Sequence, residues 1–211
     1  MKKLLRRSIN KIKSFLKPKN KNNDSDNRLE IIAELKAQKK TDIERWSINE
    51  ELYTDWDERT KILGDYILPD AFIIEFGAGN MFLKNYLKNY SKYTPTDIIQ
   101  RFDETIVCDL NETLSIDLSG YNTIVFSGVL EYVYDIDRIF KQLDSNIKQI
   151  VLSYCCADII KVTRQKNGWL SDFTYDELIQ IFKKHDFEVK DYTEWRKQSI
   201  FNLLKKSNIS E

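Results

Sequence analysis

The residues best suited to hold a ligand surround two glycines, Gly77 and Gly79, in the stretch IIEFGAGNMFL. An apolar run precedes this pair and an amphipathic run follows it. A strand–Gly-x-Gly–helix turn lets the backbone approach a ligand at the start of a helix. Glu75 lies two residues before Gly77, and Asp97 lies 18 residues after Gly79, at the end of the next apolar run. Because a carboxylate there can accept hydrogen bonds from both hydroxyls of a ribose, the pattern predicts a site for a ribose-bearing ligand.

The same stretch argues against other nucleotide sites. Phe82 occupies the third glycine position of the G-x-G-x-x-G dinucleotide fingerprint. Glu75 beside a pyrophosphate would bring two negative charges together, so this carboxylate suits a ligand with a cationic amine or sulfonium. The chain has no G-x-x-x-x-G-K-[ST] sequence, so a nucleotide triphosphatase is unsupported.

Histidine and cysteine usage excludes further chemistries. A Ser-His-Asp triad or a multi-histidine zinc site would need His185, the single histidine, which we expect to lie away from the ligand site. Three cysteines without a C-x-x-C pattern predict a reducing compartment rather than a disulfide scaffold. We expect Cys155 and Cys156 to be small buried side chains, and we expect no metal site.

Short apolar runs alternate with amphipathic stretches after Pro69. We expect strands over residues 71–76, 91–94, 104–108, 121–126, 148–154, 187–195 and 198–206. We expect helices over residues 28–40, 49–67, 80–90, 135–143 and 174–185. Pro95 should end the second strand by Thr94, and Thr174 with Glu177 should form a capping box. This order predicts an α/β fold with a doubly wound, mostly parallel seven-stranded sheet that ends in an antiparallel hairpin.

With these motifs in order, residues 69–206 resemble the class I S-adenosylmethionine-dependent methyltransferases, which have a Rossmann-like fold. EFGAGNM is similar to the family's acidic residue and spaced glycines, and YTPTDI to its ribose-binding segment. VCDL is similar to the segment near the adenine, and FSGVLEYV to the segment lining the methionine side. Met81 departs from the family's third glycine, and Tyr132 stands where many relatives carry a histidine.

The resemblance implies S-adenosylmethionine as cofactor, and no metal. The cofactor-binding residues that it implies are Glu75, Gly77, Ala78, Gly79, Asp97, Ile98, Asp109, Leu110, Ser127 and Gly128. Glu131 and Tyr132 follow the fourth strand at its carboxyl end, where ligands collect in open α/β sheets. They would be catalytic residues, as acceptor contacts or a general base. The alternative is a helix N-terminal acid and a packing aromatic.

The first part of the chain differs from the rest in charge. The chain has 33 Lys+Arg and 33 Asp+Glu, but residues 1–21 carry nine basic side chains and no acid, so the remainder has a net charge of −9. Apolar residues within 1–16 have helical spacing, and KPKNKNNDSDN indicates a flexible linker. A basic amphipathic helix suits an anionic membrane surface. The alternatives are a solvated tail, a helix docked on the acidic body or on a partner, and an organellar presequence.

We therefore predict three parts of the chain. They are a basic amphipathic helix with a flexible linker (1–27), a helical N-terminal cap (28–68) and a methyltransferase core (69–211). Trp46, Trp56 and Arg59 lie in the cap region, and Trp169 and Asp172 lie after the fifth strand, where relatives often contact the acceptor. We expect neither a signal peptide nor a membrane span, because no apolar run is long enough.

The predicted function is methyl transfer from S-adenosylmethionine to a small-molecule or glycan acceptor, as an O-methyltransferase. The predicted location is the cytoplasm, with peripheral contact at the inner membrane through residues 1–20 as an option. The alternatives are a protein or nucleic-acid methyltransferase, a non-catalytic Rossmann-like binding module and an adenine-nucleotide oxidoreductase. No nucleic-acid partner is expected, because the acidic body lacks the basic face that such binding needs.

Overall fold

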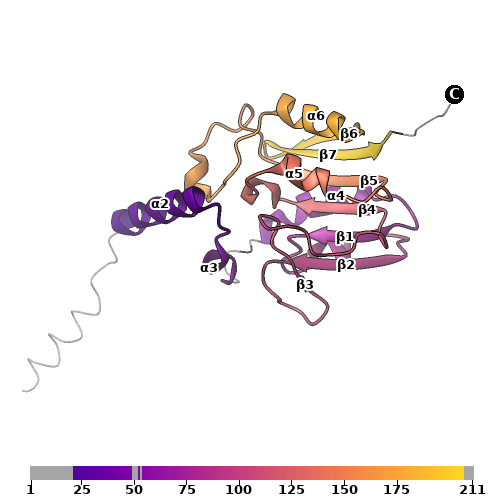
Figure 1. Ribbon diagram of the computed structural model, residues 1–211, viewed down its shortest axis with the longest axis horizontal. Helices are drawn as coiled ribbons and strands as arrows, with labels where there is room; N and C mark the ends of the chain where they lie inside the picture. The colour runs from indigo at the N-terminus through magenta and orange to yellow at the C-terminus, as the bar shows by residue number, and fades with distance from the viewer. Residues whose placement is uncertain (1–20, 49–51, 53, 207–211) are drawn as a thin grey trace, which may run out of the picture.

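The computed structural model describes residues 21–48, 52 and 54–206 (Figure 1). Within these residues, seven strands form one sheet in the order β3-β2-β1-β4-β5-β7-β6. The strands are β1 (Phe72–Phe76), β2 (Lys92–Asp97), β3 (Ile106–Val107), β4 (Thr123–Ser127), β5 (Gln149–Tyr154), β6 (Phe187–Trp195) and β7 (Gln198–Lys205). Strands β1 to β5 pair in parallel, and β7 runs antiparallel to both β5 and β6. The predicted Rossmann-like α/β sheet with its antiparallel C-terminal hairpin is confirmed.

The helices of the described residues are mostly short. They are α2 (Lys21–Gln38), α3 (Ile43–Trp46), α4 (Asp57–Tyr66), α5 (Ile136–Lys141) and α6 (Tyr175–Lys184). Four 3-10 turns accompany them: η2 (Thr54–Trp56), η3 (Phe82–Asn85), η4 (Leu130–Tyr132) and η5 (Arg164–Asn167). Figure 1 shows α2 and α3 at one end of the sheet. No helix among residues 21–48, 52 and 54–206 combines the length and apolar character that crossing a bilayer requires.

Both faces of the sheet carry a buried apolar layer. Side chains alternate between the two faces along a strand. Ile74 and Phe76 of β1 therefore join the core beneath α5 and α6, and Ile73 joins the smaller core beneath α4 with Leu63. By the same alternation Glu75 shares the α4 face with Ile73. A carboxyl side chain is thus placed inside an apolar layer, which is the first structural sign of a site.

The order in which successive strands are added to the sheet reverses between β1 and β4. From β1 the chain continues to β2 and β3 on one side, whereas β4 leads to β5 on the other side. The connections diverge here, so they leave a crevice outside the carboxyl ends of β1 and β4, where ligands bind in open α/β sheets.

The prediction of a helix over residues 80–90 is wrong, since the structure has only the 3-10 turn η3 there. Met81 precedes η3 with a φ of 57° and makes no side-chain cap hydrogen bond. Asn89 also has a positive φ, of 51°. Left-handed backbone at both ends interrupts a helical path. Leu83 in η3 is still fully buried. The helical spacing of the apolar residues in 80–90 therefore reflects burial of a turn, not a continuous helix.

The prediction that Pro95 ends the second strand is also wrong, because β2 continues to Asp97. The carbonyl of Thr96 accepts a hydrogen bond from Ala78 N, and the carbonyl of Asp97 accepts one from Cys108 N on the opposite side. Alternation therefore turns the Pro95 nitrogen toward the β3 side. Strand β3 pairs only with Thr96 and Asp97, so the missing N–H costs no ladder hydrogen bond.

Several boundaries differ from the prediction. Helix α2 begins at Lys21, so residues 21–27 are helical rather than a flexible linker; they contain neither glycine nor proline. Helix α4 begins at Asp57, well inside the predicted helix 49–67, and the predicted strand 104–108 is reduced to the two residues of β3. The predicted amphipathic helix and membrane contact of residues 1–20 lie outside the described residues and stay predictions.

The predicted capping box at the start of α6 is confirmed and can be tested. Thr174 Oγ1 accepts a hydrogen bond from Glu177 N, and Glu177 Oε2 accepts one from Thr174 N at 2.7 Å. Thr174→Ala should lower the free energy of unfolding by about 1 kcal/mol in urea titrations, because a helix N–H loses its acceptor. Thr174→Ser keeps the hydroxyl and should stay close to wild type. Equal stability of the alanine variant and wild type would contradict the assignment.

Candidate active site

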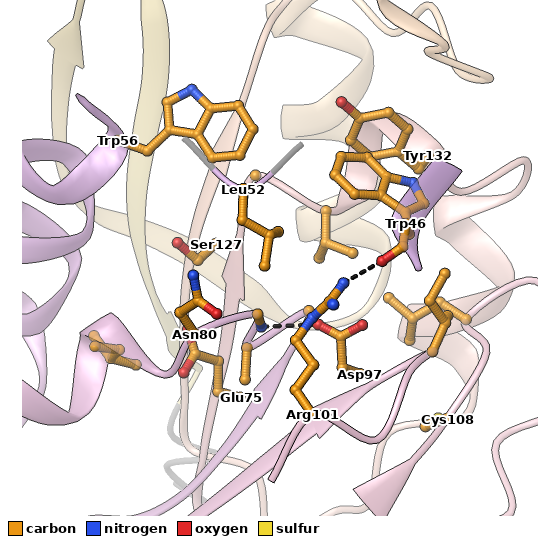
Figure 2. Close-up of a pocket in the computed structure, with 18 of the residues that line it drawn as sticks. Trp46, Leu52, Trp56, Glu75, Asn80, Asp97, Arg101, Cys108, Ser127 and Tyr132 are labelled. Carbon is orange, nitrogen blue, oxygen red and sulfur yellow. Dashed lines mark hydrogen bonds between the residues drawn. The ribbon is translucent and has the colours of Figure 1, made fainter. Parts of the chain in front are cut away.

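A pocket, here called the first pocket, opens at the carboxyl ends of β1, β2 and β4, at the switch point of the sheet (Figure 2). Its lining includes all ten residues that the sequence predicted for cofactor binding: Glu75, Gly77, Ala78, Gly79, Asp97, Ile98, Asp109, Leu110, Ser127 and Gly128. Tyr132 also lines it, and Glu131 does not. Residues from four separate loops are therefore brought together by the order of the strands.

The loop after β1 has the left-handed backbone that a glycine-rich turn requires. Gly77 and Gly79 have φ angles of 72° and 50°, and Met81 has a φ of 57°. Met81 therefore adopts, at a cost in backbone energy, the conformation that a glycine would adopt without strain. The Asp97 carboxylate accepts a hydrogen bond from Gly79 N at 2.8 Å, which attaches the loop to the end of β2. Asp97 thus orients the loop and also faces the pocket.

Glu75 is a buried acid on the floor of the first pocket. Its side chain accepts a hydrogen bond from the Tyr93 hydroxyl at 2.5 Å. Burial raises the pKa of Glu75 to about 8, and the hydrogen bond from Tyr93 and the positive charge of Arg59 only partly oppose this. The carboxyl group is therefore mostly protonated at neutral pH in the ligand-free protein. A cationic ligand group beside it would favour the ionised form.

The segment between α2 and α3 closes one side of the first pocket. Asp109 accepts hydrogen bonds from the Thr41 hydroxyl at 2.7 Å and from Asn111 N at 2.9 Å. The Arg101 guanidinium donates a hydrogen bond to the carbonyl of Trp46 (Figure 2). These contacts attach the region before β1 to the loops that follow β2 and β3.

Arg59 of α4 is 6% exposed and lies where the first pocket meets a neighbouring one. Its guanidinium donates hydrogen bonds to the Ser127 carbonyl at 3.3 Å and to Gln198 Oε1 at 3.2 Å. Burial lowers the pKa of Arg59, and the negative charge of Glu131 opposes the shift. A Cβ atom on Gly128 would lie 2.4 Å from Arg59 Nη1 and would displace the guanidinium, and the φ of 66° also favours glycine there.

A second pocket adjoins the first and contains the predicted acid, Glu131. Its lining includes Arg59, Glu131, Tyr132, Cys155 and Gln198 together with the indole rings of Trp56, Trp169 and Trp195. Glu131 and Tyr132, the two catalytic candidates, meet only here, because Tyr132 lines both pockets. Burial raises the pKa of Tyr132, which keeps its phenol protonated.

Glu131 is 1% exposed and its two carboxylate oxygens differ. Oε1 accepts hydrogen bonds from Cys155 N at 2.8 Å and from Gln198 Nε2 at 3.2 Å. Oε2 has no hydrogen-bond partner among the described residues. An unpaired buried carboxylate oxygen is costly, so it is a position where a ligand could donate a hydrogen bond.

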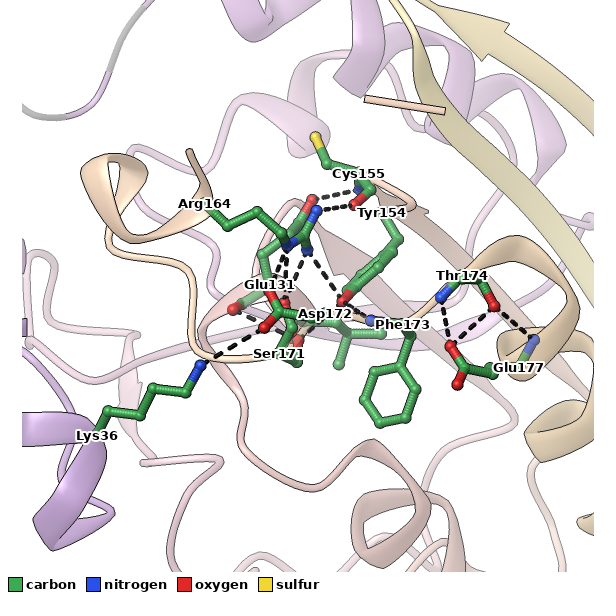
Figure 3. Close-up of polar contacts among 11 residues, drawn as sticks. Lys36, Glu131, Tyr154, Cys155, Arg164, Ser171, Asp172, Phe173, Thr174 and Glu177 are labelled. Carbon is green, nitrogen blue, oxygen red and sulfur yellow. Dashed lines mark hydrogen bonds and ion pairs between the residues drawn. The ribbon is translucent and has the colours of Figure 1, made fainter. Parts of the chain in front are cut away.

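Arg164 holds the segment that carries Trp169, since its guanidinium lies over the Trp169 ring and makes the polar contacts to Ser171 and Asp172 drawn in Figure 3. Arg164 donates hydrogen bonds to the carbonyls of Cys155 and Ser171, at 2.7 and 2.8 Å, and forms an ion pair with Asp172 at 2.6 Å. The carbonyl of Glu131 accepts a further hydrogen bond from Leu170 N at 2.7 Å. Asp172, which lies in a segment where relatives often contact the acceptor, stabilises this segment through its ion pair with Arg164.

Of the other reactive side chains, Cys155 lines the second pocket, whereas His185 and Cys156 line neither pocket. His185 pairs with Asp137 at 2.8 Å, outside both pockets. Cys155 and Cys156 are buried as predicted, and burial raises the pKa of both thiols, to about 11 for Cys156. Within the described part of the chain, no group of three or more His, Cys, Asp or Glu side chains is placed to hold a metal ion.

No sequence pattern predicts that Gln198 and Trp195 belong to the site, or what Arg59 and Tyr93 do there. Tyr93 lies in a predicted strand. Its role depends on the hydrogen bond from its hydroxyl to Glu75 on the neighbouring strand, which only the structure shows. Trp195 and Gln198 are at the tip of the C-terminal hairpin, where they pair directly. Only their position next to β5 makes them part of the site, so no local signal was present.

Comparisons with known proteins agree with this geometry at the level of fold. No protein-family model matches the chain, and no curated protein sequence matches it. Among solved structures, a putative methyltransferase of Haloferax volcanii, in complex with the Trm112 methyltransferase activator, has a TM-score of 0.55 and 10% identity over 74% of this chain and 100% of its own. The N-methyltransferase NodS from Bradyrhizobium japonicum has a TM-score of 0.52 and 13% identity over 72% and 87%. Mitomycin 7-O-methyltransferase has a TM-score of 0.53 and 12% identity over 83% of this chain and 60% of its own. The chain therefore has the fold of class I S-adenosylmethionine-dependent methyltransferases.

The protonated state of Glu75 predicts a pH dependence of stability. Its ordinary pKa is 4.5 and its folded value is about 8, so the folded protein binds more protons than the unfolded chain between these values. The free energy of unfolding should therefore fall as pH rises through this window, by at most about 1.4 kcal/mol per pH unit. Glu75→Gln should remove this contribution and be relatively more stable at pH 8 than at pH 5.

Urea unfolding at pH 5, 6.5 and 8 measures this difference. Glu188→Gln changes an exposed carboxyl on β6 and is the matched control. If the stability difference between Glu75→Gln and wild type is the same at all three pH values, the protonated buried state of Glu75 is wrong.

Proposed function

We propose that this protein is an S-adenosylmethionine-dependent methyltransferase that methylates a hydroxyl of a small-molecule or glycan acceptor. The observation that carries the proposal is the meeting of two pockets at Arg59, one surrounded by the ten cofactor candidates and one containing an unpaired carboxylate oxygen. The fold shared with methyltransferases of known structure supports the class of reaction.

The residues of the first pocket fit S-adenosylmethionine chemically. The left-handed backbone at Gly77 and Gly79 allows close approach of a ligand to the loop after β1. Asp97 has lone pairs left after its hydrogen bond from Gly79 N, and these can accept from ribose hydroxyls. Glu75 would take up the cationic end of the ligand and lose its proton on binding. Asp109 and Leu110 would contact the adenine.

Glu131 would be the general base and Tyr132 an acceptor contact. When bound, S-adenosylmethionine supplies an electrophilic methyl group on a sulfonium. The first-pocket residues would hold this cofactor beside the acceptor, and Glu131 Oε2 would accept the hydroxyl proton as the acceptor oxygen is methylated. The buried walls exclude water and hold the reacting atoms in line, which supplies most of the rate acceleration.

The cofactor assignment is tested at Asp97. Asp97→Asn should weaken binding of S-adenosylhomocysteine at least about tenfold, because hydrogen bonds to a charged group contribute more than neutral ones. Titration calorimetry measures the dissociation constant. Asp103→Asn, an exposed acid in the loop after β2, is the matched control and should bind normally. Unchanged affinity of Asp97→Asn would refute the cofactor site.

The base is tested at Glu131. Glu131→Gln should reduce turnover by about 10² to 10⁴, the usual contribution of a general base. Its affinity for S-adenosylhomocysteine should stay near wild type, because Glu131 lies outside the first pocket. Single-turnover assays with labelled methyl donor, on acceptor fractions separated into lipid, glycan and small molecules, give the rate. Normal turnover would remove Glu131 as the base.

A further inference from the structure

Three of the chain's four tryptophans line the second pocket. Trp56 comes from η2, Trp169 follows η5, and Trp195 ends β6. Tryptophan offers a large flat apolar surface, and ring-shaped ligands stack on such surfaces. Tertiary structure alone brings these three rings together, and Trp195 also packs against the smaller core beneath α4.

We propose that the second pocket is a subsite for an uncharged aromatic ring that carries a hydroxyl group, so that the acceptor is a phenolic small molecule rather than a glycan. The part of this inference that makes the ring the methyl acceptor rests on the proposed function. The recognition itself rests on three features: the polar atoms left open, the charges on the walls, and the turn that presents Trp195.

The second pocket has few buried polar atoms left unpaired. Among the lining residues, only Glu131 Oε2 and Arg59 Nε are buried side-chain atoms without a hydrogen-bond partner in the described part of the chain. One is an acceptor and the other a donor. A phenolic hydroxyl can donate to Glu131 and leave the rest of the ring against the indoles. A sugar would bring several hydroxyls into the same space, and each unpaired one would cost free energy.

The charges on the walls disfavour a cationic acceptor. A guanidinium already lies over each indole: Arg59 over Trp56 at 5.5 Å, Arg164 over Trp169 at 4.6 Å and Arg196 over Trp195 at 4.5 Å. An ammonium ligand would have to approach these positive groups. Arg196 is paired with Asp55 at 3.0 Å, and Arg59 lies beside Glu131, so the pocket presents no unbalanced charge for a strongly charged ligand.

The hairpin turn presents two of the pocket residues together. Arg196 and Lys197 form a two-residue turn with φ angles of 46° and 65°, a conformation usually left to Asn and Gly. Directly paired residues in an antiparallel hairpin project from the same face. The turn therefore places Trp195 beside Gln198, whose amide donates to Glu131 Oε1 and accepts from Arg59. This strained turn sets both the apolar wall and the orientation of the carboxylate.

Binding of simple probes to the full chain without cofactor tests the subsite. Saturation-transfer NMR titrations would compare 2-naphthol with 2-methoxynaphthalene, which lacks the donor, with methyl α-D-glucopyranoside and with benzylamine. The expected result is that 2-naphthol binds at least about tenfold more tightly than each of the others. Tighter binding of the glucoside or of benzylamine, or equal binding of the two naphthalenes, overturns the proposal.

Two variants assign the contacts. In Glu131→Gln, the dissociation constants of 2-naphthol and 2-methoxynaphthalene should lie within about threefold of each other. The reason is that the glutamine amide can donate a hydrogen bond to the hydroxyl oxygen or to the methoxy oxygen. Trp195→Leu should weaken both naphthalenes alike, and Trp195→Phe should restore most of the affinity if the leucine variant folds poorly. Tyr90→Leu, at the opposite edge of the sheet, is the control. A naphthol preference that survives Glu131→Gln contradicts the role of Oε2.

The outcomes separate this inference from the proposed function. If 2-naphthol binds as expected but S-adenosylhomocysteine does not bind, the proposed methyltransferase function is wrong and the ring-binding site stands. If S-adenosylhomocysteine binds and 2-naphthol does not, the cofactor assignment stands and the phenolic subsite is wrong.

Discussion

Arg59 carries a positive charge into the interior at the point where the two pockets meet. Removing an ion from water is costly, so its surroundings must supply acceptors and an opposite charge. Ser127 at the end of β4, Gln198 at the start of β7 and the Glu131 carboxylate provide them. Gly128 leaves the space that the guanidinium occupies. A single buried group therefore holds α4, strands β4 and β7 and the loop after β4 in one arrangement.

The same charge influences the acids of both pockets. Burial keeps Glu75 protonated near neutral pH despite the nearby guanidinium, so Glu75 itself adds no negative charge to the first pocket. In the second pocket, Gln198 bridges Arg59 and one oxygen of Glu131, which leaves the other oxygen open. A cofactor site and an acceptor site can thus be adjacent without placing two unpaired charges against each other.

Much of the first pocket could be predicted from local patterns. Gly77, Gly79 and Asp97 stand at strand ends, and the carboxyl ends of parallel strands share one edge of a sheet, so their convergence follows from the alternation of strands and helices. Local conformation was less predictable. The spacing of residues 80–90 is helical, yet left-handed backbone at Met81 and Asn89 limits the segment to a turn. Pro95 stays in β2 because its nitrogen faces an unpaired edge, which depends on how short β3 is.

The sequence by itself determined the class of sheet and the acids and glycines of the first pocket, because hydrophobic period and residue type act over a few neighbouring positions. Only the tertiary structure decided the second pocket. Trp56, Trp169 and Trp195 are far apart in the chain and meet because β7 pairs with β5 and β6 in that order. The open oxygen of Glu131 has the same origin, since its other oxygen is occupied by Gln198 from the last strand. Long-range strand pairing creates these contacts, and no local pattern encodes which distant residues it will bring together.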